Sequence, residues 1–421
     1  MRCSNVKNTQ FFLLLILLFS IVSCGDKKTQ NELHKTAEIN AKTTSDNMSV
    51  SNSLGDIEIS NPADYSSLLK DKRIAIVANQ TSVVENKNGG FVHLVDTLFR
   101  MNFDIKKVFS PEHGFRGTAD AGEHIDDGVD AATGLPLISL YGAHKKPSPE
   151  QLSDVDIVIF DIQDVGVRFY TYISTLHYVM EACAEAKIPL IVIDRPNPNA
   201  HYIDGPMLEK EHRSFVGMHP VPLVYGMTIG EYAAMINGEG WLDNGVTCEL
   251  NVMPLKHYTH QTPYSLPIKP SPNLPNDLAI NLYPSLGFFE GTLVSAGRGT
   301  AKQFQLFGAP FLPKEHYPYE FTPQSNPGAK FPKFKGELCH GIDLSDHPRL
   351  EEVNLKWLIE AYKHSADKDK YFNTFLTKLA GTTTLRTQIE AGWSADKIRN
   401  SWRPEIDKFK QLREQYLRYT E

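Results

Sequence analysis

The sequence has few cysteines and lacks the common nucleotide-binding motifs. Five of its 421 residues are cysteine, and beyond Cys24 only Cys183, Cys248 and Cys339 remain. This odd, widely spaced set argues against both a disulfide framework and a zinc site. No Walker loop is present, and no Gly-x-Gly-x-x-Gly follows the first expected strand. We therefore predict neither a nucleotide cofactor nor a bound metal.

The most apolar stretch of the chain is too short to cross a membrane. It is the twelve-residue run Phe11–Val22, whereas a spanning helix needs roughly 20 apolar residues. Such a run near the N-terminus predicts a secretory signal. The residues from Ile21 to Cys24 resemble a bacterial lipobox, which implies cleavage before Cys24 and lipid attachment to it. We expect a lipoprotein signal peptide over residues 1–23, with a plain cleaved signal peptide as the alternative.

Positive charge is also scarce. The formal net charge is −7, and loss of Arg2 and Lys7 with the signal peptide makes it −9 (−7 − 2). So acidic a chain offers no electrostatic case for binding nucleic acid. Residues 24–56 are polar, with little to bury, and predict a disordered tether. We expect a cell-envelope protein, periplasmic or in the outer membrane, that meets the membrane only through its lipid anchor. The oligomeric state stays open.

The folded part contains short apolar runs that each end in polar residues. We expect strands at Arg73–Ala78, Ile105–Phe109, Val155–Phe160 and Pro189–Ile193. Between them the spacing predicts helices over Gly90–Met101 and Val167–Lys187. Strands that alternate with helices form a parallel sheet, so the four polar clusters share one edge. The sequence predicts an α/β fold, with a Rossmann-like parallel sheet in a domain over residues 57–205.

After that point the pattern loosens. Thr228–Asn237 reads as a helix with a capping box of Thr228 and Glu231, and Arg403–Tyr419 reads as another helix. A proline-rich loop and a glycine-rich loop lie between them. We predict a smaller α+β domain over residues 206–421.

Carboxylates stand where these strands end. Glu112 and His113 follow one strand between Pro111 and Gly114, where a turn holds side chains into a crevice. Asp161 and Asp164 follow the next strand. Structural alternatives exist: Glu112 caps a helix or pairs with a nearby arginine, and the aspartates hold the backbone turn.

Two facing carboxylates suggest glycoside hydrolysis, whereas the same acids with His113 suit metal-dependent hydrolysis. The residues alone leave both open. Several arginines near the strand ends, Arg116, Arg168 and Arg298 among them, would suit a ligand that bears a carboxylate.

Longer motifs in a fixed order carry a family resemblance. They are Ser110–Gly117, Phe160–Tyr172, Asp194–Pro198, Ser271–Pro275 and Glu290–Thr300. This set resembles the NamZ-type exo-β-N-acetylmuramidases, formerly a domain of unknown function. The resemblance implies an active site in the cleft between a Rossmann-like and a smaller C-terminal domain. It also implies removal of terminal N-acetylmuramic acid from the non-reducing end of peptidoglycan fragments.

Within this resemblance we expect Glu112 to be the general acid/base, beside His113, with Asp161 or Asp164 as its partner. We expect Asp164 to contact the substrate and Asp161 to support the backbone turn. The expected substrate contacts are Arg116, Arg168, Tyr170, Tyr172, Gln163, Asn79, Asn197, Asn273, Glu290 and Arg298. Among the arginines we favour Arg116 for the lactyl carboxylate of muramic acid.

One departure from the family pattern concerns specificity. The family often has Pro-Phe-Glu after the glycine-arginine loop, whereas this chain has Gln303-Phe304-Gln305. Two rival functions remain: a metal-dependent hydrolase or deacetylase of the cell wall, and a wall-binding lipoprotein without catalytic activity.

Overall fold

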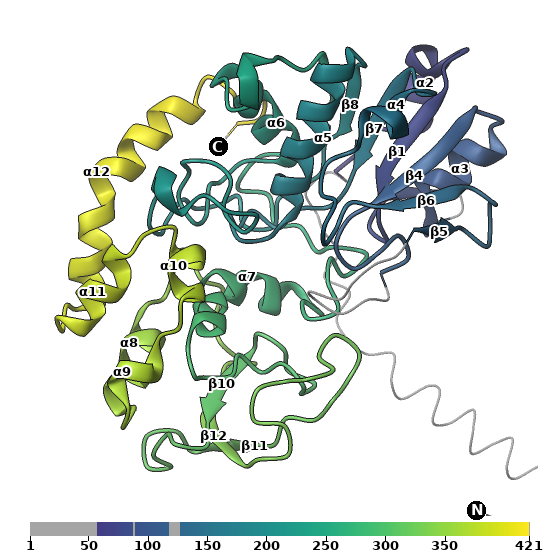
Figure 1. Cartoon of the computed structure of the whole chain (residues 1–421). Helices are drawn as coiled ribbons and strands as arrows, with labels where there is room; N and C mark the ends of the chain where they lie inside the picture. Colours follow the sequence, from purple (N-terminus) through teal and green to yellow (C-terminus); the bar gives the residue numbers. More distant parts are fainter. Residues whose placement is uncertain (1–56, 87–88, 118–126, 421) are drawn as a thin grey trace, which may run out of the picture. The chain divides into compact units, whose positions relative to one another are not determined.

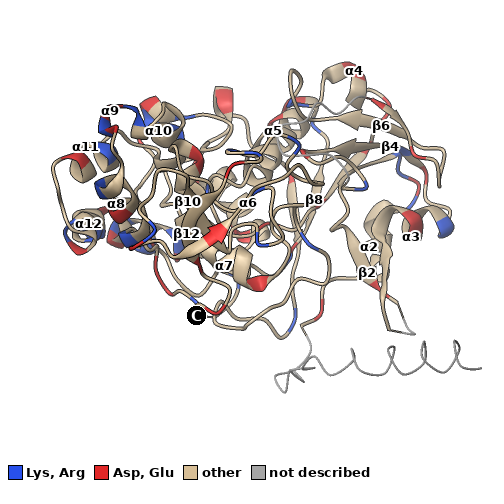
Figure 2. Ribbon diagram, turned by 90° about the horizontal axis from the view of Figure 1, so that it is seen from below, with Lys and Arg blue, Asp and Glu red and all other residues tan. Residues whose placement is uncertain are grey.

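The computed structural model describes residues 57–86, 89–117 and 127–420, and everything below refers to these residues. The expected signal peptide, the lipidation site Cys24 and the tether lie outside them. Among the residues described, no helix combines the length and the apolar character that crossing a bilayer requires. Basic and acidic side chains are interspersed over the ribbon, as on the helices near the C-terminus (Figure 2).

A seven-stranded sheet organises the first half of the chain (Figure 1). Its strands are β1 (Ile74–Ala78), β4 (Ile105–Ser110), β5 (Gly128–Val129), β6 (Pro136–Ser139), β7 (Ile157–Asp161), β8 (Leu190–Ile193) and β9 (Leu250–Met253). Their order is β5-β6-β4-β1-β7-β8-β9. All neighbours pair in parallel except β5, which is antiparallel to β6. The four expected strands are confirmed, and they lie side by side at the centre of the sheet.

Buried strand residues alternate between the two faces. In β1, Ala75 and Val77 belong to one apolar cluster, whereas Ile74 and Ile76 belong to another. Because successive side chains point to opposite faces, a strand this apolar must be covered on both. Helices α2 (Pro62–Leu69) and α3 (Leu94–Arg100) cover one face, and α5 (Tyr172–Ala186) and α6 (Ile229–Gly238) cover the other.

The rest of the chain adds a small sheet and short helices. The further elements are β2 (Val83–Glu85), β3 (Phe91–His93), α4 (Pro149–Leu152), α7 (Asp277–Leu286), β10 (Leu306–Ala309), β11 (Tyr319–Phe321), β12 (Cys339–Asp343), α8 (Lys356–His364), α9 (Lys368–Tyr371), α10 (Phe375–Ala380), α11 (Thr384–Glu390) and α12 (Ala395–Arg413). Three short 3₁₀ helices are η1 (Lys210–His212), η2 (Asp243–Gly245) and η3 (Gly287–Gly291). β10, β12 and β11 form an antiparallel sheet, and β2 and β3 form a hairpin. The predicted combination of a large parallel sheet with a smaller α+β region is confirmed.

The boundary between the two regions is less simple than expected. Strand β9 joins the large sheet although it follows residue 205, where we expected the first domain to end. The apolar cluster on the α5 face also continues without a break into α7, α8, α10 and α12. The C-terminal region therefore shares one apolar core with the helices that cover this face of the sheet.

Several helix limits differ from the sequence prediction. Residues 91–93 form strand β3, so the helix predicted from Gly90 begins at Leu94. Helix α5 begins at Tyr172 and not at Val167, because Val167 forms a β-bridge with Val224 and residues 168–171 form a turn. Helix α12 contains Pro404, and the chain is helical on both sides of it, from Ala395 to Arg413. The capping box of α6 is confirmed, since the Thr228 side chain accepts from the Glu231 amide and the Glu231 carboxylate accepts from the Thr228 amide.

Candidate active site

A cavity of about 270 Å³ lies at the carboxyl ends of β4, β6 and β7. This is the edge at which open parallel sheets bind their ligands. Its other wall comes from the loop before α7, from α7 and from η3. The lining residues are Glu112, His113, Tyr141, Phe169, Tyr170, Thr171, Phe215, Val216, Ser271, Asn273, Leu274, Tyr283, Gly287, Glu290, Arg298, Phe304, Phe375 and Leu379. The cavity thus combines a mostly apolar surface with a few polar groups, as small-molecule sites do.

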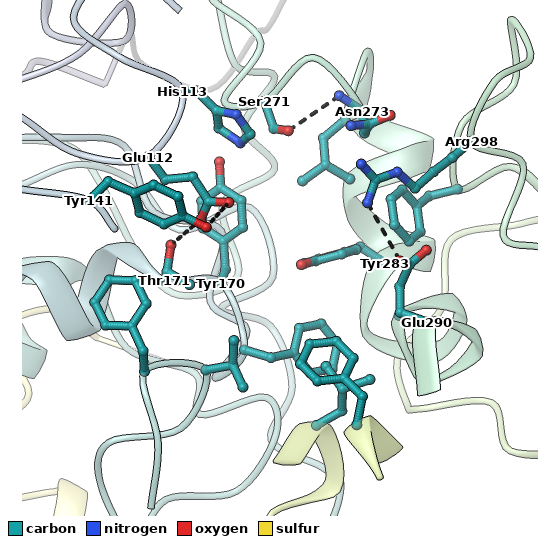
Figure 3. A pocket seen from close by; sticks show the side chains of 18 residues that line it. Glu112, His113, Tyr141, Tyr170, Thr171, Ser271, Asn273, Tyr283, Glu290 and Arg298 are labelled. Carbon is teal, nitrogen blue, oxygen red and sulfur yellow. Dashed lines mark hydrogen bonds and ion pairs between the residues drawn. The ribbon is translucent and has the colours of Figure 1, made fainter. Parts of the chain in front are cut away.

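Glu112 points into this cavity from the turn after β4 (Figure 3). Its two carboxylate oxygens accept separate hydrogen bonds, Oε1 from the Tyr141 hydroxyl at 3.0 Å and Oε2 from the Thr171 hydroxyl at 2.8 Å. Tyr141 follows β6 and Thr171 lies between β7 and α5, so groups from two different connections hold the Glu112 carboxylate. The turn is tight: His113, which is buried, has a φ of 73°, a left-handed conformation that is costly for a residue with a side chain.

The opposite wall carries a second carboxylate. Glu290 in η3 forms an ion pair with Arg298, with 3.5 Å between Oε2 and Nη1. Figure 3 shows this pair facing Glu112 across the cavity, with Tyr283 beside it. The Arg298 Nη2 and the Asn273 Nδ2 both donate to the carbonyl of Gly328, at 3.1 and 2.6 Å. Two carboxylates in different hydrogen-bonding environments therefore face one space.

Asp161, at the end of β7, does not line the cavity. Its carboxylate accepts from Arg195, at 2.6 Å from Nε and 2.9 Å from Nη2. Both side chains are nearly inaccessible, with 1% and 2% exposed. Arg195 also donates to the carbonyl of Val83 at 3.0 Å. Asp161 thus joins the ends of β7 and β8, and its role as support for the backbone turn stays a prediction.

Asp164 is buried behind the cavity wall and does not line it either. Its Oδ2 accepts from the Gly166 amide at 2.7 Å and from the Tyr225 hydroxyl. Burial raises the pKa of Asp164 to about 6, which the hydrogen bonds from Tyr225 and Gly166 only partly oppose. Gly166 itself has a φ of 75°. The carboxylate therefore stabilises the turn between β7 and α5, and the structure does not bring it to the expected substrate contact.

The raised pKa of Asp164 gives a stability prediction with a definite sign. The ordinary pKa is 3.8 and the folded value is about 6, so between these values the folded state binds the proton more tightly than the unfolded state does. Stability then falls as pH rises from about 4 to 6, by on the order of 2–3 kcal/mol, and changes no further above that window. We expect Asp164→Asn to reduce this slope, as measured by Tm against pH from 4 to 8; Asp194, whose pKa burial also raises to about 6, keeps its own contribution in the variant. If the wild type and the variant show parallel curves across the window, the Asp164 carboxyl is not titrating there.

Two of the predicted arginines are bound to other groups of the protein. Arg116 contacts Asp130 and Asp96, with Nη2–oxygen distances of 3.0 and 3.1 Å. Arg168 is fully buried and donates to backbone carbonyls of Pro206, Val221, Leu379 and Ala380, at 2.6 to 3.0 Å. Neither arginine lines the cavity, and Arg168 instead joins the turn before α5 to the end of α10.

The remaining predicted residues divide between the cavity and its support. Tyr170, Asn273, Glu290 and Arg298 line it. Tyr172 donates to the Pro270 carbonyl at 3.4 Å, and Gln163 donates to the carbonyls of Asp164 and Pro196. Asn79 accepts from the Thr81 amide, and Asn197 donates to the Met227 carbonyl. These four side chains hold the strand-end turns together.

Sequence reasoning missed Tyr141, Thr171 and Tyr283. Tyr141 stands two residues after β6 and before Gly142, a pattern that marks a strand end, but β6 has only four residues, which is too short to be recognised. Within the described ranges, the single group of metal-ligating side chains close enough to share an ion is Glu209, Glu211 and His212. None of these lines the cavity.

Comparisons with known proteins agree over nearly the whole described chain. The family model "Exo-beta-N-acetylmuramidase NamZ, N-terminal" matches residues 74–278, and the corresponding C-terminal model matches residues 281–419. The chain is 41% identical over 379 residues to the peptidoglycan β-N-acetylmuramidase NamZ of Bacillus subtilis (strain 168), covering 85% of this chain and 89% of that protein.

Two crystal structures of DUF1343 family proteins from Bacteroides fragilis NCTC 9343 are also similar. One has a TM-score of 0.80 at 46% identity and covers 87% of this chain and 99% of its own. The other has a TM-score of 0.72 at 28% identity and covers 85% of this chain and 97% of its own.

Proposed function

The chain belongs to the NamZ family of exo-β-N-acetylmuramidases, and we propose that its cavity takes the terminal, β-linked N-acetylmuramic acid at the non-reducing end of peptidoglycan fragments. As a member of this family the protein is a glycoside hydrolase. The observation that carries the assignment of the site is the pair of carboxylates, Glu112 and Glu290, on facing walls of one cavity (Figure 3).

Glycoside hydrolysis needs one group that protonates the leaving oxygen and a second carboxylate that acts as base or nucleophile. We assign the first role to Glu112, whose oxygens are held by the Tyr141 and Thr171 hydroxyls. We assign the second role to Glu290, since neither Asp161 nor Asp164 lines the cavity. Arg298, paired with Glu290, would orient that carboxylate.

The test is release of the chromophore from a chromogenic β-N-acetylmuraminide, with the matching β-N-acetylglucosaminide as the comparison substrate. Turnover that survives treatment with a chelator supports the glycosidase over a metal-dependent hydrolase. Binding without turnover would instead favour a wall-binding protein.

The lactyl group of muramic acid gives a prediction for Arg298. Its carboxylate requires a cation, and of the three candidate arginines only Arg298 lines the cavity. A hydrogen bond to a charged group contributes about 1.5–3 kcal/mol, so we expect Arg298→Ala to lower kcat/KM on the muraminide by about 10–100-fold relative to the glucosaminide. If the substitution also disturbs Glu290, kcat/KM falls for both substrates. The ratio of kcat/KM on the muraminide to kcat/KM on the glucosaminide therefore reports recognition of the lactyl group alone.

Arg116→Ala is the matched control, because Arg116 is paired with Asp96 and Asp130 away from the cavity. We expect it to leave the ratio unchanged. A fall in that ratio for Arg116→Ala but not for Arg298→Ala would return the lactyl site to Arg116.

We also propose that the protein is anchored in the cell envelope by lipid on Cys24. The apolar run Phe11–Val22 and the lipobox-like residues before Cys24 support this. Mass spectrometry of the mature N-terminus distinguishes a lipidated cysteine from the end left by a plain signal peptide.

A further inference from the structure

The segment between β11 and β12 contacts the Arg298 side chain and the backbone of the turn that carries Glu290, without lining the cavity. Gly328 accepts from Arg298, as described above, and the Gln324 amide donates to the Gly299 carbonyl at 2.8 Å. Pro332 packs closely against Gly299: a Cβ atom added to Gly299 would lie 2.6 Å from the Pro332 side chain. The loop that carries Arg298 therefore rests on this segment.

Lys333, the next residue of the segment, makes the corresponding contact with the turn that carries Glu290. Its ammonium donates to the carbonyls of Phe289 at 2.8 Å, Thr292 at 2.8 Å and Val294 at 3.1 Å, and a longer contact of 3.5 Å reaches that of Glu290. These carbonyls lie at the C-terminal end of η3 and just beyond it, where a short helix leaves acceptor capacity unused; the Phe289 carbonyl also accepts from the Thr292 amide. A single side chain thus satisfies the backbone on both sides of Glu290.

Lys333 also lies within the electrostatic field of the Glu290–Arg298 ion pair. Burial lowers the pKa of its ammonium, the Glu290 charge acts to raise it, and the Arg298 charge acts to lower it. An amine with three rotatable donors suits carbonyls that converge from several directions, whereas a planar guanidinium would not. An apolar residue of similar length at position 333 would offer these carbonyls no side-chain hydrogen-bond donor.

We infer that Lys333 is a positioning residue for the reaction: it fixes the turn that places the Glu290 carboxylate opposite Glu112. The inference rests on the proposed role of Glu290. A catalytic group displaced by about 1 Å can lose 10²-fold in rate, so loss of the ammonium should act on kcat more than on KM.

The experiment compares Lys333→Met with Lys335→Met, which removes an exposed lysine two residues further along the same segment. We expect Lys333→Met to lower kcat on the chromogenic muraminide by about 10–100-fold with KM changed less than about threefold, and Lys335→Met to change neither. Assays run well below the Tm of each variant. Equal kcat values in the two folded variants would overturn the inference.

A double-mutant cycle separates positioning from general support of the fold. If Lys333 acts through Glu290, the Lys333→Met change should cost little further activity in a Glu290→Gln background, whereas losses that simply multiply would contradict the inference. If Glu290→Gln alone keeps wild-type turnover, the proposed role of Glu290 fails, and that failure is distinct from one of Lys333.

Chemical rescue adds a readout that a structural role would not move. In Lys333→Ala, added ethylammonium can place N–H donors among the four carbonyls, whereas tetramethylammonium has the charge but no donor. We expect the first to restore a measurable part of kcat and the second to restore none. Identical responses to both ions would contradict the inference.

Discussion

Replacing Glu112 with glutamine is expected to lower kcat by about 10²–10⁴-fold, the usual contribution of a general acid or base. The substitution keeps the size of the side chain and removes the ionisable carboxyl group that proton transfer needs. Its hydrogen bonds can be kept, because the Tyr141 and Thr171 hydroxyls that now donate to the carboxylate can each rotate to accept. The loss should therefore fall on turnover of the muraminide and leave Tm almost unchanged.

Two further variants bracket this result. Tyr141→Phe removes one of the two hydroxyls that donate to Glu112, and we expect a smaller loss of kcat than Glu112→Gln gives. Glu315→Gln removes an exposed glutamate outside the cavity and should have no effect. Near wild-type kcat in a stable Glu112→Gln protein would exclude Glu112 as the general acid.

The centre of the fold was predictable because its signals are strong and local. Val155–Phe160 is a short apolar run that ends in charge, and only a strand covered on both faces buries such a run. The same reasoning places Glu112 at the ligand-binding edge, since a parallel topology fixes the edge at which each strand ends. Position in the topology was enough to find the first catalytic candidate.

Which strand-end charges reach the cavity was not predictable in the same way. Arg168, Arg116 and Asp161 stand within a few residues of cavity residues, yet each is bound to partners distant in sequence. Such pairings depend on how the elements pack against one another, which the periodicity of the sequence does not show. The opposite wall, with Glu290 and Arg298, comes from loops whose glycines and prolines show only that the chain turns.

The Asp161–Arg195 pair is the place where a single change should cost the most stability. Both groups are buried and joined by two hydrogen bonds, of 2.6 and 2.9 Å. Asp161→Asn would leave the Arg195 guanidinium buried without its counter-charge, and removing one partner of such a pair costs about 3–5 kcal/mol. We expect a correspondingly lower midpoint in urea, with kcat near the wild-type value at temperatures where the variant is folded.

Asp156→Asn is the control, because Asp156 contacts Arg73 with the same two-bond geometry at the surface. Its distances are 3.0 and 2.8 Å, and the two side chains are 33% and 43% exposed. At the surface, water replaces the hydrogen bonds that the remaining side chain loses, so this variant should change stability far less than Asp161→Asn does.

A double variant tests whether the unpaired charge causes the loss. The protein with both Asp161→Asn and Arg195→Met is expected to be more stable than Asp161→Asn alone, since the second change removes the unpaired charge. If Asp161→Asn instead abolishes turnover at unchanged stability, Asp161 belongs to the chemistry and not to the support of the strand ends.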